Sequence, residues 1–351
     1  MIFSQRIVLF QWLLCLLILI VGCQSPQTTP PVSSKDTVYV SGYYQDGTSS
    51  IPCYWKNGSR VDLPGTSTTG AYAVSICLEG TQPLLGGWVN NNTQGVPCIW
   101  QNGSKIDWPA GTVDTGDWGI AYDNGSIYLA GQAKDTGGVY TATIWKDQVK
   151  TALPGDGTHS SDANSVVIVN SHIFVGGYYS NGTQNVACYW KDGIRFDLAS
   201  GSTGNAMVQS LTADSTGNVS FGGYYSDGTK LVPCIWTSNG RTDLVGDGVH
   251  DSQVIDLKVA NGQTYASGYY GNGTNNIPCY WANGSRHDLL VANAKNGYAR
   301  GIDIKDGDIY ISGNYIDQNG ISIACTWKNE NRVDLPGDGV HLAAAYHVIV
   351  D

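Results

Sequence analysis

Tryptophan recurs at almost constant intervals along this chain of 351 residues, and this regularity constrains the fold more than any other feature. Successive members lie 45 or 46 residues apart, and a glycine precedes each of them by 13 or 14 residues. A period of about 40–50 residues is typical of solenoids, arrays and propellers, whose repeats are small supersecondary units. The tryptophans are Trp55, Trp100, Trp145, Trp190, Trp236, Trp281 and Trp327, and the glycines are Gly42, Gly87, Gly131, Gly177, Gly223, Gly268 and Gly313.

Each unit contains four short segments that favour β-strands. In the unit at 163–201, apolar and β-branched runs occupy 165–169, 173–179, 186–191 and 194–198, with Asn-, Gly- and Asp-rich turns between them. Asn-Gly and Asp-Gly between such runs are hairpin signals, and no segment has the period of an amphipathic helix. We therefore expect an all-β fold, a seven-bladed β-propeller with four antiparallel strands per blade.

The two ends of the repeat region fall at different points of the unit. Residues 38–44 match the second strand of a unit, and residues 343–350 match the first strand. The C-terminal strand can therefore join the three N-terminal strands and close the ring. Closure hides the sheet edge that an open array would expose. We expect the propeller to span 38–351.

The layout resembles the bacterial extracellular repeats named after their His-Ala-Phe motif and, more loosely, kelch-type propellers. The shared elements are a YWKDG or IWQNG strand, a following DL with a Gly turn, and an IYVSG or IFVGG strand. The resemblance covers all seven units, although Cys replaces Phe before the tryptophan. It implies the propeller fold and implies little about activity.

The first 22 residues have the pattern of a secretory signal. One arginine precedes a 15-residue apolar run, and Val21 and Gly22 stand before Cys23. A charged start, a short apolar run and small residues before the cut are the marks of such a signal, and the run is short for a membrane span. The motif resembles a bacterial lipobox, which implies that Cys23 carries a lipid. We expect residues 23–37 to form a flexible tether. Gln24, rather than Asp, follows Cys23, and resemblance to enterobacterial lipoprotein sorting implies the outer membrane or cell surface. The alternative is an uncleaved anchor.

Several residue types recur in every unit or nearly so, and blade architecture explains them best. Cysteine stands two residues before the tryptophan in six units, so the two side chains share a strand face. We expect them to fill the seams between blades and to form no disulfide, since equivalent positions on different blades lie too far apart. On the fourth strand a basic residue precedes an Asp by two positions in six units. We expect these charges to protect the outer edge and to pair weakly.

Tyrosine pairs near the end of the second strand are candidates for ligand binding. Tyr rings beside hydroxyl and amide groups stack on sugars or form protein-binding surfaces. The alternative is that one ring of each pair packs between blades. The candidate residues are Tyr44, Tyr179, Tyr225 and Tyr270.

Three connections between blades share the pattern Gly-Asp-Gly-x-His. They recur 91 residues apart and place Asp and His side chains on one face of the ring. Asp and His are ligands for divalent metals, so a cation site is one hypothesis. The alternative is a turn in which Asp accepts backbone N–H groups and His tethers neighbouring blades. The residues are Asp156, His159, Asp247, His250, Asp338 and His341.

A specific site in a repeat protein requires asymmetry. The connection at 108–120 departs most from the repeat and brings Asp114, Asp117 and Trp118. The segment 293–300 is the second divergent region. We expect a specific ligand at one of these two places.

Composition and motifs limit the function. The net charge of −10 and the absence of a basic run argue against nucleic acid as a partner. No serine elbow or zinc-binding helix motif is present, and most carboxylates belong to the repeat. We expect a monomeric, non-enzymatic envelope module that binds a glycan or a protein through the face of the second-to-third-strand loops and the blade connections, without an obligate cofactor. The alternatives are a scaffold of an envelope complex and a polysaccharide hydrolase or lyase.

Overall fold

The computed structural model describes residues 36–65, 70–91, 94–109, 115–134, 137–199, 201, 204–289, 291 and 294–351. Residues 36–351 form one compact unit. The predicted signal segment, Cys23 and most of the tether lie outside the described residues. Within those residues, no helix has the length and apolar character needed to cross a bilayer.

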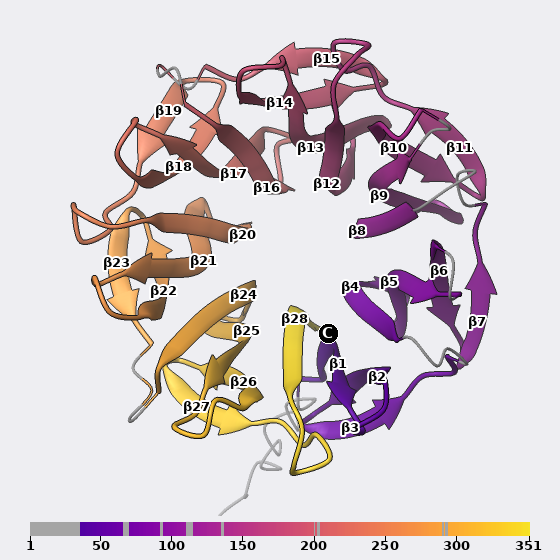
Figure 1. The fold of residues 1–351 in the computed structure, drawn as a ribbon, viewed down its shortest axis with the longest axis vertical. Helices are drawn as coiled ribbons and strands as arrows, with labels where there is room; N and C mark the ends of the chain where they lie inside the picture. The colour runs from indigo at the N-terminus through magenta and orange to yellow at the C-terminus, as the bar shows by residue number, and fades with distance from the viewer. Residues whose placement is uncertain are drawn as a thin grey trace, which may run out of the picture. The chain divides into compact units, whose positions relative to one another are not determined.

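Seven four-stranded antiparallel sheets form a ring, which confirms the predicted seven-bladed propeller (Figure 1). From the inner strand outward, blade 1 contains β28 (Ala343–Val350), β1 (Val38–Gln45), β2 (Ser50–Lys56) and β3 (Ser59–Asp62). Blade 2 contains β4 (Ala71–Glu79), β5 (Gln82–Asn90), β6 (Gly95–Gln101) and β7 (Ser104–Asp107). Blade 3 contains β8 (Thr115–Asp123), β9 (Ser126–Lys134), β10 (Tyr140–Lys146) and β11 (Val149–Ala152).

The other four blades repeat this order. Blade 4 contains β12 (Ser161–Val169), β13 (His172–Ser180), β14 (Asn185–Lys191) and β15 (Ile194–Asp197). Blade 5 contains β16 (Ala206–Ala213), β17 (Val219–Ser226), β18 (Leu231–Thr237) and β19 (Gly240–Asp243). Blade 6 contains β20 (Ser252–Ala260), β21 (Gln263–Gly271), β22 (Asn276–Ala282) and β23 (Ser285–Asp288). Blade 7 contains β24 (Asn296–Lys305), β25 (Asp308–Ile316), β26 (Ser322–Lys328) and β27 (Asn331–Asp334).

The two ends of the repeat region meet in blade 1. The C-terminal β28 pairs antiparallel with the N-terminal β1, with Tyr39 opposite Ile349 and Tyr44 opposite Ala343 (Figure 1). The ring is therefore closed by the strand that the sequence predicted. β28 therefore covers the edge of β1 that an open ring would expose.

The recurring tryptophans and cysteines fill the blade seams, as predicted. All seven Trp side chains are at most 2% exposed, and the six third-strand cysteines are fully buried. Trp100 Nε1 donates a hydrogen bond of 2.8 Å to the carbonyl of Pro64 in the preceding connection. A Cβ on Gly87 would lie 1.9 Å from the carbonyl oxygen of Tyr72 and 2.9 Å from the Trp100 ring, so only glycine fits there. The seven described cysteines are free thiols.

Every innermost strand carries a β-bulge. The register with the second strand shifts by one residue in each blade, between Ala73 and Ser75 in β4 for example. A bulge leaves one residue unpaired and re-aims its side chain. This irregularity brings non-repeated residues to the centre of the ring.

Candidate functional site

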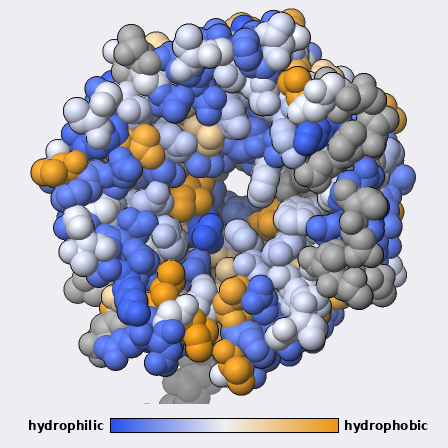
Figure 2. Space-filling view, viewed as in Figure 1, coloured by the Kyte–Doolittle hydropathy of each residue, from blue (hydrophilic) through white to orange (hydrophobic). Residues whose placement is uncertain are grey.

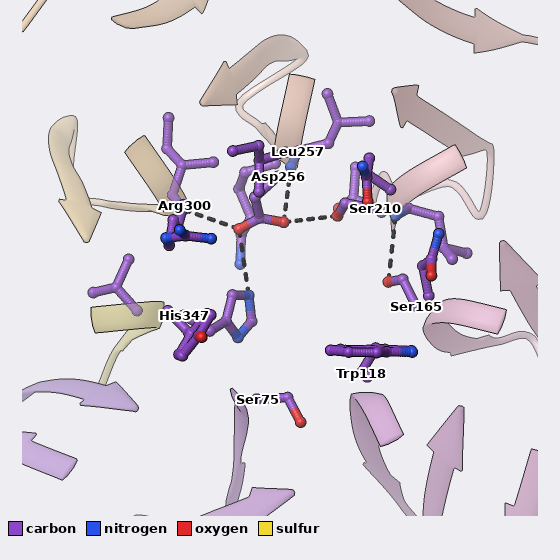
Figure 3. A pocket seen from close by; sticks show the side chains of 18 of the residues that line it. Ser75, Trp118, Ser165, Ser210, Asp256, Leu257, Arg300 and His347 are labelled. Carbon is purple, nitrogen blue, oxygen red and sulfur yellow. Dashed lines mark hydrogen bonds and ion pairs between the residues drawn. The ribbon is translucent and has the colours of Figure 1, made fainter. Parts of the chain in front are cut away.

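The centre of the ring contains a channel-like cavity of about 360 Å³, lined by the innermost strands of all seven blades. Figure 2 shows an opening in the middle of the viewed face, bordered by both hydrophilic and hydrophobic residues. Figure 3 shows side chains from different blades around it. Its volume falls within the range of small-molecule sites.

The channel lining departs from the repeat where the bulges lie. In each innermost strand, the residue two positions after the bulge is Ile, Val or Leu. This apolar position belongs to the blade core. The bulge position itself carries a different residue in each blade. These seven residues are Val74, Trp118, Asn164, Gln209, Ile255, Arg300 and Tyr346, and all of them line the cavity.

Trp118 is the most exposed of the large aromatic residues in the channel. Its side chain is 40% exposed although it lies inside the ring (Figure 3). An exposed indole offers both an apolar face and an N–H donor. Asp162, in the next blade, is buried and interacts with this indole. Burial raises the pKa of Asp162 to about 7, and hydrogen bonds from Ala163 N–H and Trp118 lower it only in part.

Arg300 enters the channel from β24. Its Nε donates a hydrogen bond of 2.8 Å to Asn314 Oδ1, and its guanidinium lies 5.4 Å from the Tyr298 ring centre and 5.1 Å from that of Tyr346. Distances below about 6 Å permit a cation–π attraction. Asn314 is only 5% exposed, so a buried side chain holds the arginine in place.

Asp256 and His347 form an ion pair across the inner wall of the channel. Nε2 of His347 lies 3.3 Å from Oδ2 of Asp256, and Ser210 Oγ donates a hydrogen bond of 2.7 Å to Oδ1 (Figure 3). The backbone N–H groups of Leu257 and Ile302 donate to the same carboxylate. Burial would raise the pKa of Asp256, but His347 and these donors together lower it. Burial alone would lower the pKa of His347, but Asp256 raises it above its ordinary value.

A second ion pair lies beside the first. Lys258 Nζ is 2.7 Å from Oδ1 of Asp303, and the Val350 N–H donates to Oδ2 of that carboxylate at 2.8 Å. Ser75, on the opposite side of the ring, lines the same cavity and is 5% exposed. Its hydroxyl has no hydrogen-bond partner among the described residues.

The four tyrosines predicted as ligand-binding candidates lie inside the blades. Tyr44, Tyr179 and Tyr225 are 8% exposed, and Tyr270 is partly buried. Their hydroxyls donate to fourth-strand aspartates at 2.9–3.2 Å, and an arginine covers each ring at 3.7–3.9 Å. The same arginines form the predicted fourth-strand ion pairs with these aspartates. Each tyrosine thus completes a repeated Tyr–Arg–Asp cluster that leaves little ring surface for a ligand.

Each Gly-Asp-Gly-x-His connection forms a turn in which the aspartate and the histidine contact one another. In each, Oδ2 of the aspartate lies 2.5–2.6 Å from Nδ1 of the histidine, and Oδ1 accepts backbone N–H groups two and three residues later. The histidine rings of His159, His250 and His341 pack on Gly182, Gly273 and Gly47 in the next blade's loop. Within the described ranges, no group of three or more His, Cys, Asp or Glu residues is placed to hold a metal. The geometry thus matches the tethering turn.

The two divergent segments, 108–120 and 293–300, contribute different residues to the channel. Asp114 and the Asp117 side chain lie outside what the structure describes, whereas Trp118 enters the channel. The segment 293–300 contributes Arg300. Sequence reasoning did not identify Asp256, His347, Ser75 or Asn314. Aligning the first strands of the seven units would have revealed Asp256 and His347, which stand directly after the bulge where other units carry Ser or Gly. Aligning the second strands would have revealed Asn314, which stands where four other units carry Tyr.

Comparison with known proteins places the fold and leaves the chemistry open. No family model and no curated protein matches the chain. Among solved structures, the chain is similar to one described as a polysaccharide lyase of a new family, PL25 ulvan lyase. The TM-score is 0.51 with 10% sequence identity, over 78% of this chain and 86% of that chain. At this level of identity the similarity concerns the propeller fold alone.

Proposed function

We propose that the protein is a non-enzymatic binding module of the bacterial cell envelope, and that it binds a glycan in the central channel. The observation that carries the proposal is the bulge position, where a sevenfold repeat presents seven different residues to one cavity. A structural position would follow the repeat, as the seam tryptophans do. An asymmetric lining is what recognition of an asymmetric ligand requires.

The chemistry of the lining favours a sugar. Trp118 and Tyr346 supply aromatic faces for the apolar side of a sugar ring. Asn164 and Gln209 supply amide groups, which can donate and accept hydrogen bonds. A mainly apolar pocket with a few placed polar groups is typical of small-molecule sites.

The envelope location rests on the sequence. The lipobox-like segment at 20–23 supports an anchor on Cys23, with the propeller held at the membrane by residues 24–37. Cys23→Ser would release the protein from the membrane fraction and abolish incorporation of labelled fatty acid. Membrane retention of that variant with its leader intact would favour the uncleaved anchor.

The binding proposal is tested on a glycan array with residues 24–351. Trp118→Ala should reduce the signal of any bound glycan by about tenfold or more, since stacking contributes roughly 1–2 kcal/mol. Phe196→Ala is the matched control, because Phe196 is 43% exposed on the outer strand β15. Equal losses in the two variants, or no glycan bound, would overturn the proposal. Stoichiometric capture of one envelope protein without glycan binding would indicate the scaffold role instead.

A polysaccharide-cleaving enzyme is the second candidate. One observation favours it: the channel holds a carboxylate and an imidazole in contact, the residue types that carry out general acid–base catalysis. The Asp256 carboxylate, however, accepts hydrogen bonds from three neighbours, which suits a structural role. Turnover of an array-positive glycan that is lost in His347→Gln would replace the binding function with an enzymatic one.

A further inference from the structure

We infer that the channel selects glycans that carry a negatively charged substituent, a carboxylate or a sulfate, and that Arg300 binds this substituent. The inference rests on the proposed function and names its ligand class. The juxtaposition that carries it is a rigidly held guanidinium inside a cavity whose other described charges are paired.

Among the described residues, the Arg300 guanidinium makes its hydrogen bond through Nε–H alone. Asn314 accepts its Nε–H, Asn314 Nδ2 donates to Ser322 Oγ at 2.9 Å, and that hydroxyl donates to the Ala343 carbonyl at 3.1 Å. The two terminal amino groups make no hydrogen bond or ion pair with any residue that the structure describes. They remain as a pair of donors, the fork that matches two oxygens of a carboxylate or sulfate.

The charges around Arg300 leave it uncompensated. Asp256 is paired with His347, and Asp303 is paired with Lys258. Arg300 has no carboxylate within ion-pair distance among the described residues. When His347 is protonated, the charged side chains of the described lining sum to one positive charge, although the whole chain carries −10. Arg300 is partly buried, and the lower local dielectric strengthens the attraction of such a charge for an anion.

Arg300 and Asn314 are both departures from the repeat, and they contact one another. Asn314 occupies the second-strand position at which four other blades carry tyrosine. A tyrosine there could not accept the Nε–H in the same way as the amide oxygen. Blade packing requires neither residue, since the other described blades are built without this pair. Their joint presence in blade 7 indicates a local function.

The test uses an array of matched saccharides: oligogalacturonates beside their methyl esters, and chondroitin sulfate oligosaccharides beside their desulfated forms. The wild-type protein should bind the more acidic member of a pair at least about tenfold more tightly, as for a charge-assisted bidentate contact. The first pair reports a carboxylate and the second a sulfate. Arg300→Gln should abolish the preference and leave the Trp118-dependent binding of the neutral member.

Two further variants serve as an independent test and as a control. Asn314→Asp retains Arg300 but places a carboxylate on its guanidinium, so it should also abolish the preference, even where Arg300→Gln fails to fold. Arg332→Gln removes a fourth-strand arginine of the same blade that is paired with Asp334, and it should keep the preference. Equal wild-type binding of acidic and neutral members, or an unchanged preference in both Arg300→Gln and Asn314→Asp, would overturn the inference alone. Binding of no saccharide would overturn the proposed function as well.

Discussion

The Asp256–His347 ion pair, at 3.3 Å, joins strands that are not neighbours in the ring. Asp256 lies on β20 and His347 on β28, and β24 packs between these two strands. The Ile302 N–H of β24 donates to the same carboxylate. The pair thus fixes the closing C-terminal strand to two other blades.

The pair should make ring stability depend on pH. The pKa of His347 is raised, so its contribution is full below about 6.5 and is lost as pH rises through the folded-state pKa. The pKa of Asp256 is lowered, so its contribution is full above about 3.9 and is lost as pH falls through the folded-state pKa. His347→Gln should cost about 2 kcal/mol near pH 5.5 and less at pH 9, measured by urea denaturation. A cost independent of pH would contradict the ion pair.

Gly301→Ala tests the close packing of β24 against the closing strand β28. A Cβ there would lie 2.6 Å from Ser312 Oγ and 2.8 Å from both Tyr346 O and Val348 N, so β28 must shift. We expect a loss of about 1–3 kcal/mol in the free energy of unfolding. Ser75→Ala, at the equivalent position of β4, is the control, and it should cost less than about 0.5 kcal/mol because the hydroxyl is unpaired. A neutral Gly301→Ala would show that the strand has room to move.

Asp162→Asn should stabilise the protein at neutral and alkaline pH. The folded-state pKa of about 7 lies above the ordinary value, so folding loses stability as pH rises from about 4 to about 7. Asparagine carries no charge and can still accept the Ala163 N–H. Relative to wild type, the variant should gain as much as about 4 kcal/mol at pH 8 and much less at pH 5. A pH-independent difference between the two proteins would place the carboxylate in a more polar setting.

The Gly-Asp-Gly-x-His turns should act without a metal. His250→Ala should lower the free energy of unfolding by about 1 kcal/mol, since it removes the hydrogen bond to Asp247 and the contact with Gly273. The melting temperature of wild type should stay the same in EDTA and in added Ca²⁺ or Zn²⁺. A rise with one cation that is absent in His250→Ala would establish the metal site.

Blade number, strand order and ring closure follow from the sequence because they depend on period, turn residues and the offset of the two ends. The seam tryptophans and cysteines follow from two-residue spacing. The channel lining does not, because a one-residue bulge decides whether Trp118 or its neighbour faces the centre. In the pair Tyr178-Tyr179, the alternation of a β-strand puts the two rings on opposite faces of the sheet. It does not predict which of the two rings Arg195 covers. The Asp256–His347 contact depends on ring geometry rather than on any local pattern.

The most direct test of the account compares two aromatic residues of similar exposure on one glycan array. Trp118 lines the channel at 40% exposure, and Phe196 lies on the outer strand at 43%. If the channel is the binding site, Trp118→Ala should lose about tenfold or more in binding while Phe196→Ala binds like wild type. Full binding by Trp118→Ala, with both variants folded, would contradict the assignment of the channel as the site.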